Sequence, residues 1–138
     1  MANFMKNETM ENMIMGWVDD HQEKLIDLSK KIWEFAELGL EEYHSSKLLA
    51  EWLEKEGFSI EMGVAGMPTA FVATWGRGNP IIGILGEYDA LPGLSQKKVP
   101  RKEPLIPGGN GHGCGHNVYG VAAAGGAIAA KKWLEREN

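Results

Sequence analysis

Gly111-His112-Gly113-Cys114-Gly115-His116-Asn117 is the stretch around which the rest of the chain is organised. It holds the only cysteine and two of the four histidines of the sequence, interleaved with glycines that let the backbone turn tightly around a bound centre. Thiolate and imidazole are side chains that a borderline-soft divalent metal such as zinc prefers. An incomplete metal shell is therefore the first interpretation of this stretch.

Three interpretations of the stretch compete. In the first, Cys114 and His116 are metal ligands, and Asp89 orients an imidazole or helps to hold a second metal. In the second, Cys114 is a nucleophile activated by a nearby histidine and by a helix amino terminus. In the third, Cys114 is a small buried hydrophobe and the histidines satisfy backbone groups. The two flanking histidines favour the metal, although zinc normally takes four ligands and this chain does not obviously supply them.

Composition bounds the class of protein. A length of 138 residues with 43% hydrophobic content suits one domain with its own core. The net charge of -5 argues against a nucleic-acid binder, which needs basic excess, and favours a small-molecule partner. A lone cysteine and the lack of a basic segment followed by an apolar one predict a reduced, cytoplasmic protein. No apolar run approaches the roughly 18 residues of a membrane-spanning helix, so we expect a soluble protein without membrane partners.

The first part of the chain is expected to be helical. Residues 1–10 are polar and Met-rich and are expected to fray at their outer end. Apolar residues then recur at steps of three and four, which predicts a helix over about residues 11–38. Asp20 followed by Glu23 can cap a helix, so Gly16 marks either a kink or a second start. The sequence leaves that choice open.

A second helix follows Gly39, which is expected to break the first one. The pattern predicts this helix over residues 41–56, with Gly57 as its stop. The residues expected to face inward are Leu48, Leu49, Trp52 and Leu53.

The period then changes from helical to two. Residues 58–62 read as a half-buried strand, and residues 69–75 read as the next strand. Residues 81–85 form a continuous apolar run, which predicts an interior strand covered on both faces. That run leads directly to Glu87 and Asp89. Ligands and catalytic groups collect at the carboxyl ends of strands in open α/β sheets, so these two acids are well placed for chemistry.

A long loop over residues 92–111 separates these acids from the metal motif. It contains four prolines and four glycines, and it is expected to be a lid, a segment ordered by a metal or partner, or a solvated surface loop. Asn117 is expected to cap a helix over about residues 118–135, whose small residues at 121–130 let it lie very close to the sheet. The loop also carries a basic cluster, for which solvation is the favoured interpretation: Lys97, Lys98, Arg101 and Lys102.

Three stretches together resemble a known family, the metal-dependent aminoacylase and carboxypeptidase family of amidohydrolases. His112-Gly113-Cys114-Gly115-His116-Asn117 is similar to the family's His-Ala-Cys-Gly-His-Asp signature. Ala36-Glu37-Leu38-Gly39-Leu40-Glu41-Glu42 resembles its Pro-Glu-Leu-Gly-Phe-Glu-Glu connection. Gly86-Glu87-Tyr88-Asp89-Ala90-Leu91-Pro92 resembles its Asp-Met-Asp-Ala-Leu-Pro element. The resemblance runs from about Trp17 to the end of the chain.

The resemblance implies an α/β fold, here the amino-terminal portion of a zinc-peptidase-like catalytic domain with a mixed central sheet flanked by helices. It implies hydrolysis of the amide bond of N-acyl amino acids, aminobenzoyl-glutamate or short peptides, with two divalent metals, often zinc or manganese. Cys114 and His116 match metal ligands, and Asp89 matches a catalytic acid near the metals. Asn117 and Glu87 depart from the commonest residues, and both fit the aminobenzoyl-glutamate utilisation branch of the family.

Members of this family continue far beyond a chain of this length. Their catalytic glutamate and their later metal ligands have no counterpart here, so residues 1–138 are expected to form a partial catalytic domain that is inactive alone and binds one metal weakly or none. An incomplete sheet leaves exposed edges, so we expect a homo-oligomer or association with a complementary subunit. The alternative function is a non-catalytic remnant or interaction subunit that self-associates.

Overall fold

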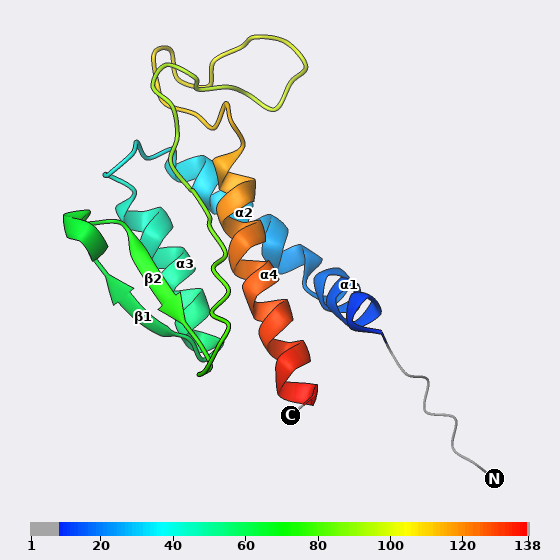
Figure 1. The fold of residues 1–138 in the computed structure, drawn as a ribbon. Coiled ribbons are helices and arrows are strands. Elements are labelled where there is room, and N and C mark those ends of the chain that lie inside the picture. The colour runs from blue at the N-terminus through cyan, green and yellow to red at the C-terminus, as the bar shows by residue number, and fades with distance from the viewer. Residues whose placement is uncertain (1–8, 138) are drawn as a thin grey trace.

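The computed structural model describes residues 9–137, and the predicted fraying of the first ten residues falls mostly on positions 1–8, which lie outside them. The described chain has the expected mixed α/β character (Figure 1). No helix among the described residues has both the length and the apolar character needed to cross a membrane. The elements are α1 (Met10–Asp20), α2 (Gln22–Phe35), α3 (Tyr43–Lys55), β1 (Ser59–Met62), the 3-10 turn η1 (Val64–Gly66), β2 (Phe71–Thr74) and α4 (His116–Glu137).

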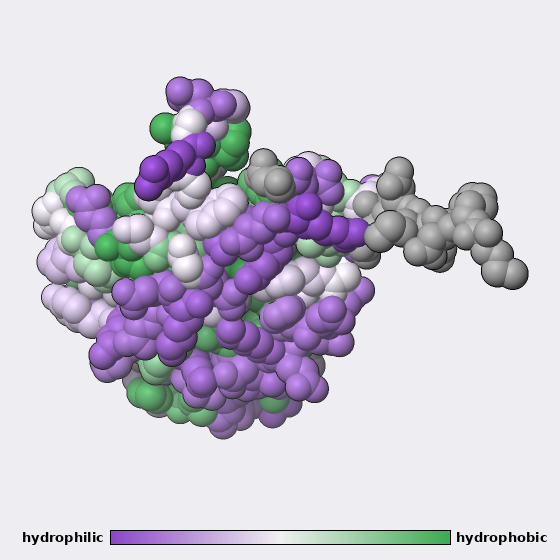
Figure 2. All heavy atoms as spheres, turned by 90° about the horizontal axis from the view of Figure 1, so that it is seen from below, coloured by the Kyte–Doolittle hydropathy of each residue, from purple (hydrophilic) through white to green (hydrophobic). Residues whose placement is uncertain are grey.

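The core lies where three helices meet. Helix α4 packs against α1, α2 and α3, and the sheet packs against α3 (Figure 1). Ile32 of α2 and Ile128 of α4 are fully buried in this layer. The buried cluster consists of Leu28, Ile32, Leu49, Trp52, Leu53, Val121, Ala124 and Ile128. Hydrophilic residues cover much of the face seen in Figure 2.

The helical pattern predicted over about residues 11–38 is confirmed as two helices, so the alternative of a second start is the correct one. The break lies at His21, not at Gly16. His21 leaves helical geometry (φ -110°, ψ 8°), its ring Nδ1–H donates to the Trp17 carbonyl at 2.8 Å, and its ring stacks on the Trp17 ring. The imidazole thus satisfies a carbonyl at the end of α1, and the chain restarts as α2.

Helix α2 also ends earlier than the predicted Gly39. Ala36 follows the last helical residue and takes up left-handed geometry, with φ 45°. The backbone beyond it pairs elsewhere, because the Glu37 carbonyl accepts from the Ala90 N–H at 2.7 Å and Leu38 forms a parallel bridge with Ala90. A pairing between residues far apart in the sequence therefore sets this helix end.

The second helix and the two following strands are confirmed. Helix α3 ends just before Gly57, whose φ of +88° is the left-handed geometry that glycine tolerates best. Strands β1 and β2 pair antiparallel, with Ser59 opposite Thr74 and Met62 opposite Phe71. Leu49, Trp52 and Leu53 are buried as expected.

The predicted interior strand at residues 81–85 is wrong. The run forms no strand within residues 9–137, and Ile81, Ile82 and Leu85 are 86%, 78% and 72% exposed. An interior strand needs a neighbour on each side and a layer on each face. Strands β1 and β2 pair with each other, and the described chain supplies no further strand to pair with this run. The apolar pattern of residues 81–85 was therefore not sufficient to place this run in the interior of the fold.

The long loop before α4 is irregular and projects beyond the end of α2 (Figure 1). Its own side chains hold it together. The Gln96 amide donates to the carbonyls of Lys97 and Arg101, at 3.0 and 2.7 Å. The Glu103 carboxylate pairs with Lys97 and Arg101, each at 2.6 Å. Within the predicted basic cluster, Lys97 and Arg101 therefore share one carboxylate, and Lys98 lies over the Trp33 ring.

Candidate metal centre

The three motifs of the sequence meet at one end of the molecule. Leu38 of the first motif bridges Ala90 of the second, and Leu91 forms an antiparallel bridge with Gly111 of the third. The second bridge has two backbone hydrogen bonds, each of 3.0 Å. Segments from three parts of the chain are therefore joined backbone to backbone beside the amino end of α4.

Three ligand-type side chains lie together at this junction. His116 is the first residue of α4; its Nδ1 lies 2.7 Å from Asp89 Oδ1, and its Nε2 lies 3.0 Å from Glu87 Oε2. One ligand atom of each residue lies within 4.8 Å of the others. Because alternate residues of an extended chain share one face, Glu87 and Asp89 both reach the imidazole. Glu87 is exposed, and the other two residues are half-buried.

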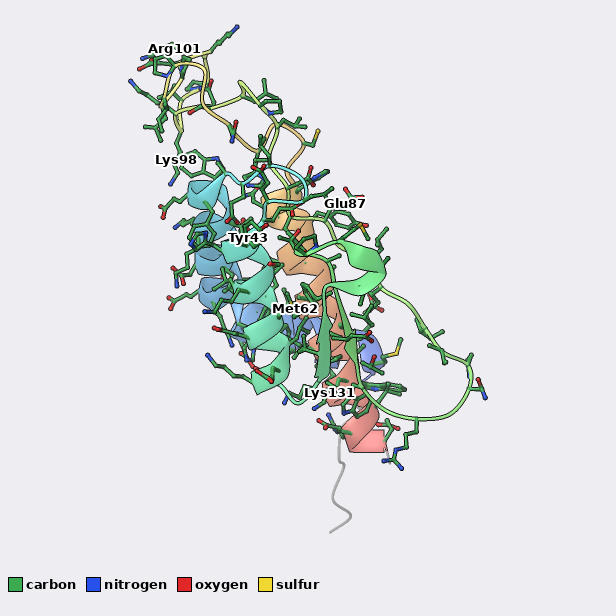
Figure 3. All side chains as sticks on the ribbon, turned by 90° about the vertical axis from the view of Figure 1, so that its left-hand side faces the viewer. Tyr43, Met62, Glu87, Lys98, Arg101 and Lys131 are labelled. Carbon is green, nitrogen blue, oxygen red and sulfur yellow. The ribbon has the colours of Figure 1, made fainter. Side chains whose placement is uncertain are left out.

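Close packing by α4 fixes the backbone that carries the two acids. A Cβ on Gly120 would lie 2.8 Å from the Glu87 carbonyl oxygen, and a Cβ on Gly86 would lie 2.8 Å from the Ala123 Cβ. Neither approach leaves room for a side chain. The close packing predicted against the sheet is seen here against residues 86–87, which belong to no strand, and Figure 3 shows Glu87 beside the first turns of this helix.

The Glu37 carboxylate fixes the first motif. It accepts hydrogen bonds from the backbone N–H and the ring Nδ1 of His44, at 2.8 and 2.7 Å. It also accepts from the backbone N–H and the hydroxyl of Ser45, at 2.9 and 2.7 Å. Burial alone would raise the pKa of Glu37, but the hydrogen bonds from His44 and Ser45 outweigh it and hold that pKa below its ordinary value. Glu37 therefore caps α3 while its carbonyl holds Ala90.

Two other side chains of the metal motif bind α2. The His112 Nε2–H donates to the Ile32 carbonyl at 3.0 Å, and burial lowers the pKa of His112. The Asn117 amide donates to the Ser29 hydroxyl at 3.0 Å. The prediction that Asn117 caps the last helix is therefore wrong, because α4 begins at His116 and the amide reaches across to α2. Both contacts hold the start of α4 against α2.

Sequence reasoning named Asp89, Cys114 and His116 for this site. The structure brings Asp89 and His116 into contact, whereas Cys114 is exposed and lies outside the Glu87, Asp89 and His116 group. Sequence reasoning placed Glu87 beside Asp89 as an acid suited to chemistry, but assigned a role in the site only to Asp89.

The donor set fits a divalent cation. Two carboxylates and one imidazole are ligands that zinc and manganese both accept. The carboxylate oxygen of Asp89 can only accept when ionised, so the Nδ1–H of His116 donates to it. That bond leaves Nε2 turned toward Glu87, which is the arrangement of an imidazole ligand oriented by a carboxylate.

Known proteins resemble the chain over most of its length. It is 45% identical over 128 residues to a p-aminobenzoyl-glutamate hydrolase subunit of Escherichia coli, a match that covers 89% of this chain and 27% of that protein. It is 32% identical to a human Xaa-Arg dipeptidase, over 86% of this chain and 26% of the relative. It is 36% identical to the thermostable carboxypeptidase 2 of Saccharolobus solfataricus, over 93% of this chain and 30% of the relative.

No protein-family model matches the chain. The chain spans about a quarter to a third of the length of these curated relatives. Their names share the hydrolysis of amide or peptide bonds, and the three motifs that carried the resemblance are the segments that meet at the Glu87, Asp89 and His116 group. The chain belongs to the metal-dependent aminoacylase and carboxypeptidase family of amidohydrolases.

Proposed function

We propose that this chain is the amino-terminal portion of a metal-dependent amidohydrolase catalytic domain and contributes residues to its metal centre. The observation that carries the proposal is the cluster of Glu87, Asp89 and His116 at the junction of the three motifs. The substrate class is an N-acyl amino acid, aminobenzoyl-glutamate or a short peptide, as the names of the relatives suggest. A single cysteine, unable to form an internal disulfide, supports a reduced, cytoplasmic location.

Each residue of the cluster has a role in this proposal. Asp89 holds the His116 imidazole by Nδ1 and so orients Nε2, while Glu87 supplies an exposed carboxylate on the Nε2 side. Cys114 stays a proposed ligand, supported by its exposure and its place two residues before His116. When bound here, a divalent ion such as zinc or manganese supplies Lewis-acid polarisation of an amide carbonyl.

Binding of Zn²⁺ or Mn²⁺ to the purified chain tests the metal centre. We expect weak binding of one ion per chain, lost in His116→Ala and Glu87→Gln because each removes one of few ligands. The matched control is Glu41→Gln, which changes an exposed glutamate outside the cluster. Calorimetric titration measures all four proteins. Equal binding by the two cluster variants and the wild type would exclude this centre.

Hydrolysis by the 138-residue chain tests the second part of the proposal. Three ligand-type side chains do not complete a pair of metal sites, so we propose that the chain alone is inactive. An assay with p-aminobenzoyl-glutamate and hippurate-type substrates, in zinc or manganese, should show no turnover above metal alone. Metal-dependent turnover that disappears in His116→Ala would show that the chain is a complete catalyst.

A second candidate function is an interaction subunit, and one observation favours it. Four large apolar residues in the run 81–85 are exposed, namely Ile81, Ile82, Ile84 and Leu85. A contiguous exposed apolar segment favours self-association or pairing with a complementary subunit. Light scattering after size exclusion should show an oligomer that Ile82→Lys dissociates. A monomer at every concentration for the wild type would count against association.

A further inference from the structure

Tyr88 lies between the two acids of the cluster and faces the other way. Alternation along the extended chain puts Glu87 and Asp89 on one side and the Tyr88 ring on the opposite side. The Tyr88 hydroxyl donates to the backbone carbonyl of Thr69 at 2.6 Å, and its ring stacks with Phe71 at a centroid distance of 6.1 Å. The segment that carries both carboxylates is thus tied to the turn before β2.

The turn before β2 is itself held by a buried pair. Thr69 is 2% exposed, and its hydroxyl donates to the Glu42 carboxylate, which belongs to a residue only 7% exposed. The Tyr88 phenol is the donor of the bond to the Thr69 carbonyl, because a carbonyl oxygen can only accept. Thr69 therefore binds both neighbours, accepting from Tyr88 at its backbone carbonyl and donating to Glu42 from its hydroxyl.

Glu42 and Asp89 both lie near Gly39. A Cβ placed on Gly39 would lie 3.9 Å from Asp89 Oδ2 and 3.9 Å from Glu42 Oε1, so both carboxylates approach the same glycine. Glu42 immediately precedes α3, and Asp89 contacts His116 at the start of α4. The network therefore ties the start of one helix to the ligand-bearing segment at the start of another.

We propose that Tyr88, Thr69 and Glu42 are positioning residues, which set the placement of the Glu87 and Asp89 carboxylates around His116 and thereby the affinity of the cluster for a divalent cation. The inference rests on the proposed metal centre. The Glu87 and Asp89 carboxylates move with the backbone that carries them. Holding the Tyr88 side chain in place therefore also holds the orientation of both carboxylates. Partners that orient metal ligands typically change affinity about 10–100-fold when they are removed.

Cobalt binding tests this network, because the visible spectrum of Co²⁺ reports ligand geometry as well as affinity. We expect Tyr88→Phe and Thr69→Val each to weaken Co²⁺ binding by about tenfold or more and to shift the spectrum. Thr69→Ser keeps the hydroxyl, so the affinity of this variant for Co²⁺ should lie within about twofold of that of the wild type. Tyr43→Phe is the matched control, because Tyr43 is exposed and lies outside the network. Circular dichroism of each variant compares the helical content.

Two outcomes separate this inference from the proposed function. Wild-type Co²⁺ affinity and spectrum in both Tyr88→Phe and Thr69→Val, with loss of binding in His116→Ala, would refute the network and leave the metal centre standing. Failure of the wild type to bind Co²⁺ would refute the metal centre. The network is then judged in metal-free protein by the NMR signal of the His116 Nδ1 proton, which donates to Asp89. That signal should broaden in Tyr88→Phe and stay in Tyr43→Phe, and identical spectra would refute the network.

Discussion

Two adjacent stretches, residues 81–85 and 86–90, differ sharply in their surroundings. The first is apolar and largely exposed, with Ile82 78% exposed, while Ala90 at the end of the second is 2% exposed. The second stretch contacts α4 through Gly86, Thr69 through Tyr88 and Glu37 through Ala90. The comparison teaches that partners, not hydrophobicity alone, place a segment inside a fold.

The largest expected effect is the difference between a buried isoleucine and an exposed one. Ile128 is fully buried and Ile82 is 78% exposed. We expect Ile128→Ala to lower the free energy of unfolding by about 2–5 kcal/mol through lost burial and a cavity. Ile82→Ala should change it by less than about 0.5 kcal/mol. Urea unfolding at low protein concentration measures both, and equal losses would mean that the run 81–85 is buried in solution.

A smaller effect tests the approach of α4 to residues 86–90. A Cβ on Gly120 would meet the Glu87 carbonyl oxygen at 2.8 Å, so Gly120→Ala should lower the free energy of unfolding by about 1–3 kcal/mol. Gly126 on the same helix has nothing within 4 Å, and Gly126→Ala should instead stabilise by up to about 1 kcal/mol. Thermal unfolding of the two variants gives the comparison, and stabilisation by both would show that α4 lies farther from Glu87.

Removal of the Glu37 charge tests the contact at the other end of residues 86–90. Glu37→Gln should lower the free energy of unfolding at neutral pH by about 1–3 kcal/mol, because several hydrogen bonds go to this carboxylate. Glu41→Gln, at an exposed glutamate nearby, should have little effect. Urea unfolding at a series of pH values measures the difference.

The same residue fixes the sign of a pH dependence. The pKa of Glu37 is lowered in the folded chain, so its contribution is fully present above the ordinary glutamate pKa of 4.5. The contribution is lost as the pH falls through the lowered folded value. The difference in the free energy of unfolding between the wild type and Glu37→Gln should therefore become smaller at acid pH. A gap that stays constant to low pH would contradict the role of the charge.

The smallest effect concerns the loop beyond residues 86–90. Glu103→Gln removes the charge that pairs with Lys97 and Arg101, both on exposed side chains. The free energy of unfolding should change by only about 0–1 kcal/mol. Local hydrogen exchange should nevertheless speed up at the Lys97 N–H, which donates to the Glu103 carbonyl. Unchanged exchange there would mean that the Gln96 contacts alone hold the loop.

Local patterns predicted several elements well. The three-to-four period and Gly57 predicted α3 nearly to its ends, and the change to a period of two predicted both strands. Asp89 and His116 were named from residue type and spacing, and they are in contact. These features succeed because the information that sets them lies within a few residues of each position.

Other predictions failed where distant residues compete for the same groups. The end of α2 depends on the pairing of Glu37 and Leu38 with Ala90, and Asn117 binds Ser29 of α2 instead of capping α4. No local pattern encodes these partners.

The sequence by itself determined the helical and strand periods, the family and most of the ligand-type residues. The tertiary structure decided that Glu87 joins Asp89 and His116, that Cys114 lies outside this group, and that residues 81–85 stay exposed. The physical reason is that periodicity specifies which face of an element is apolar, whereas a cluster of side chains depends on which backbones meet. Here the meeting is set by the Leu38–Ala90 and Leu91–Gly111 pairings and by the glycines of α4.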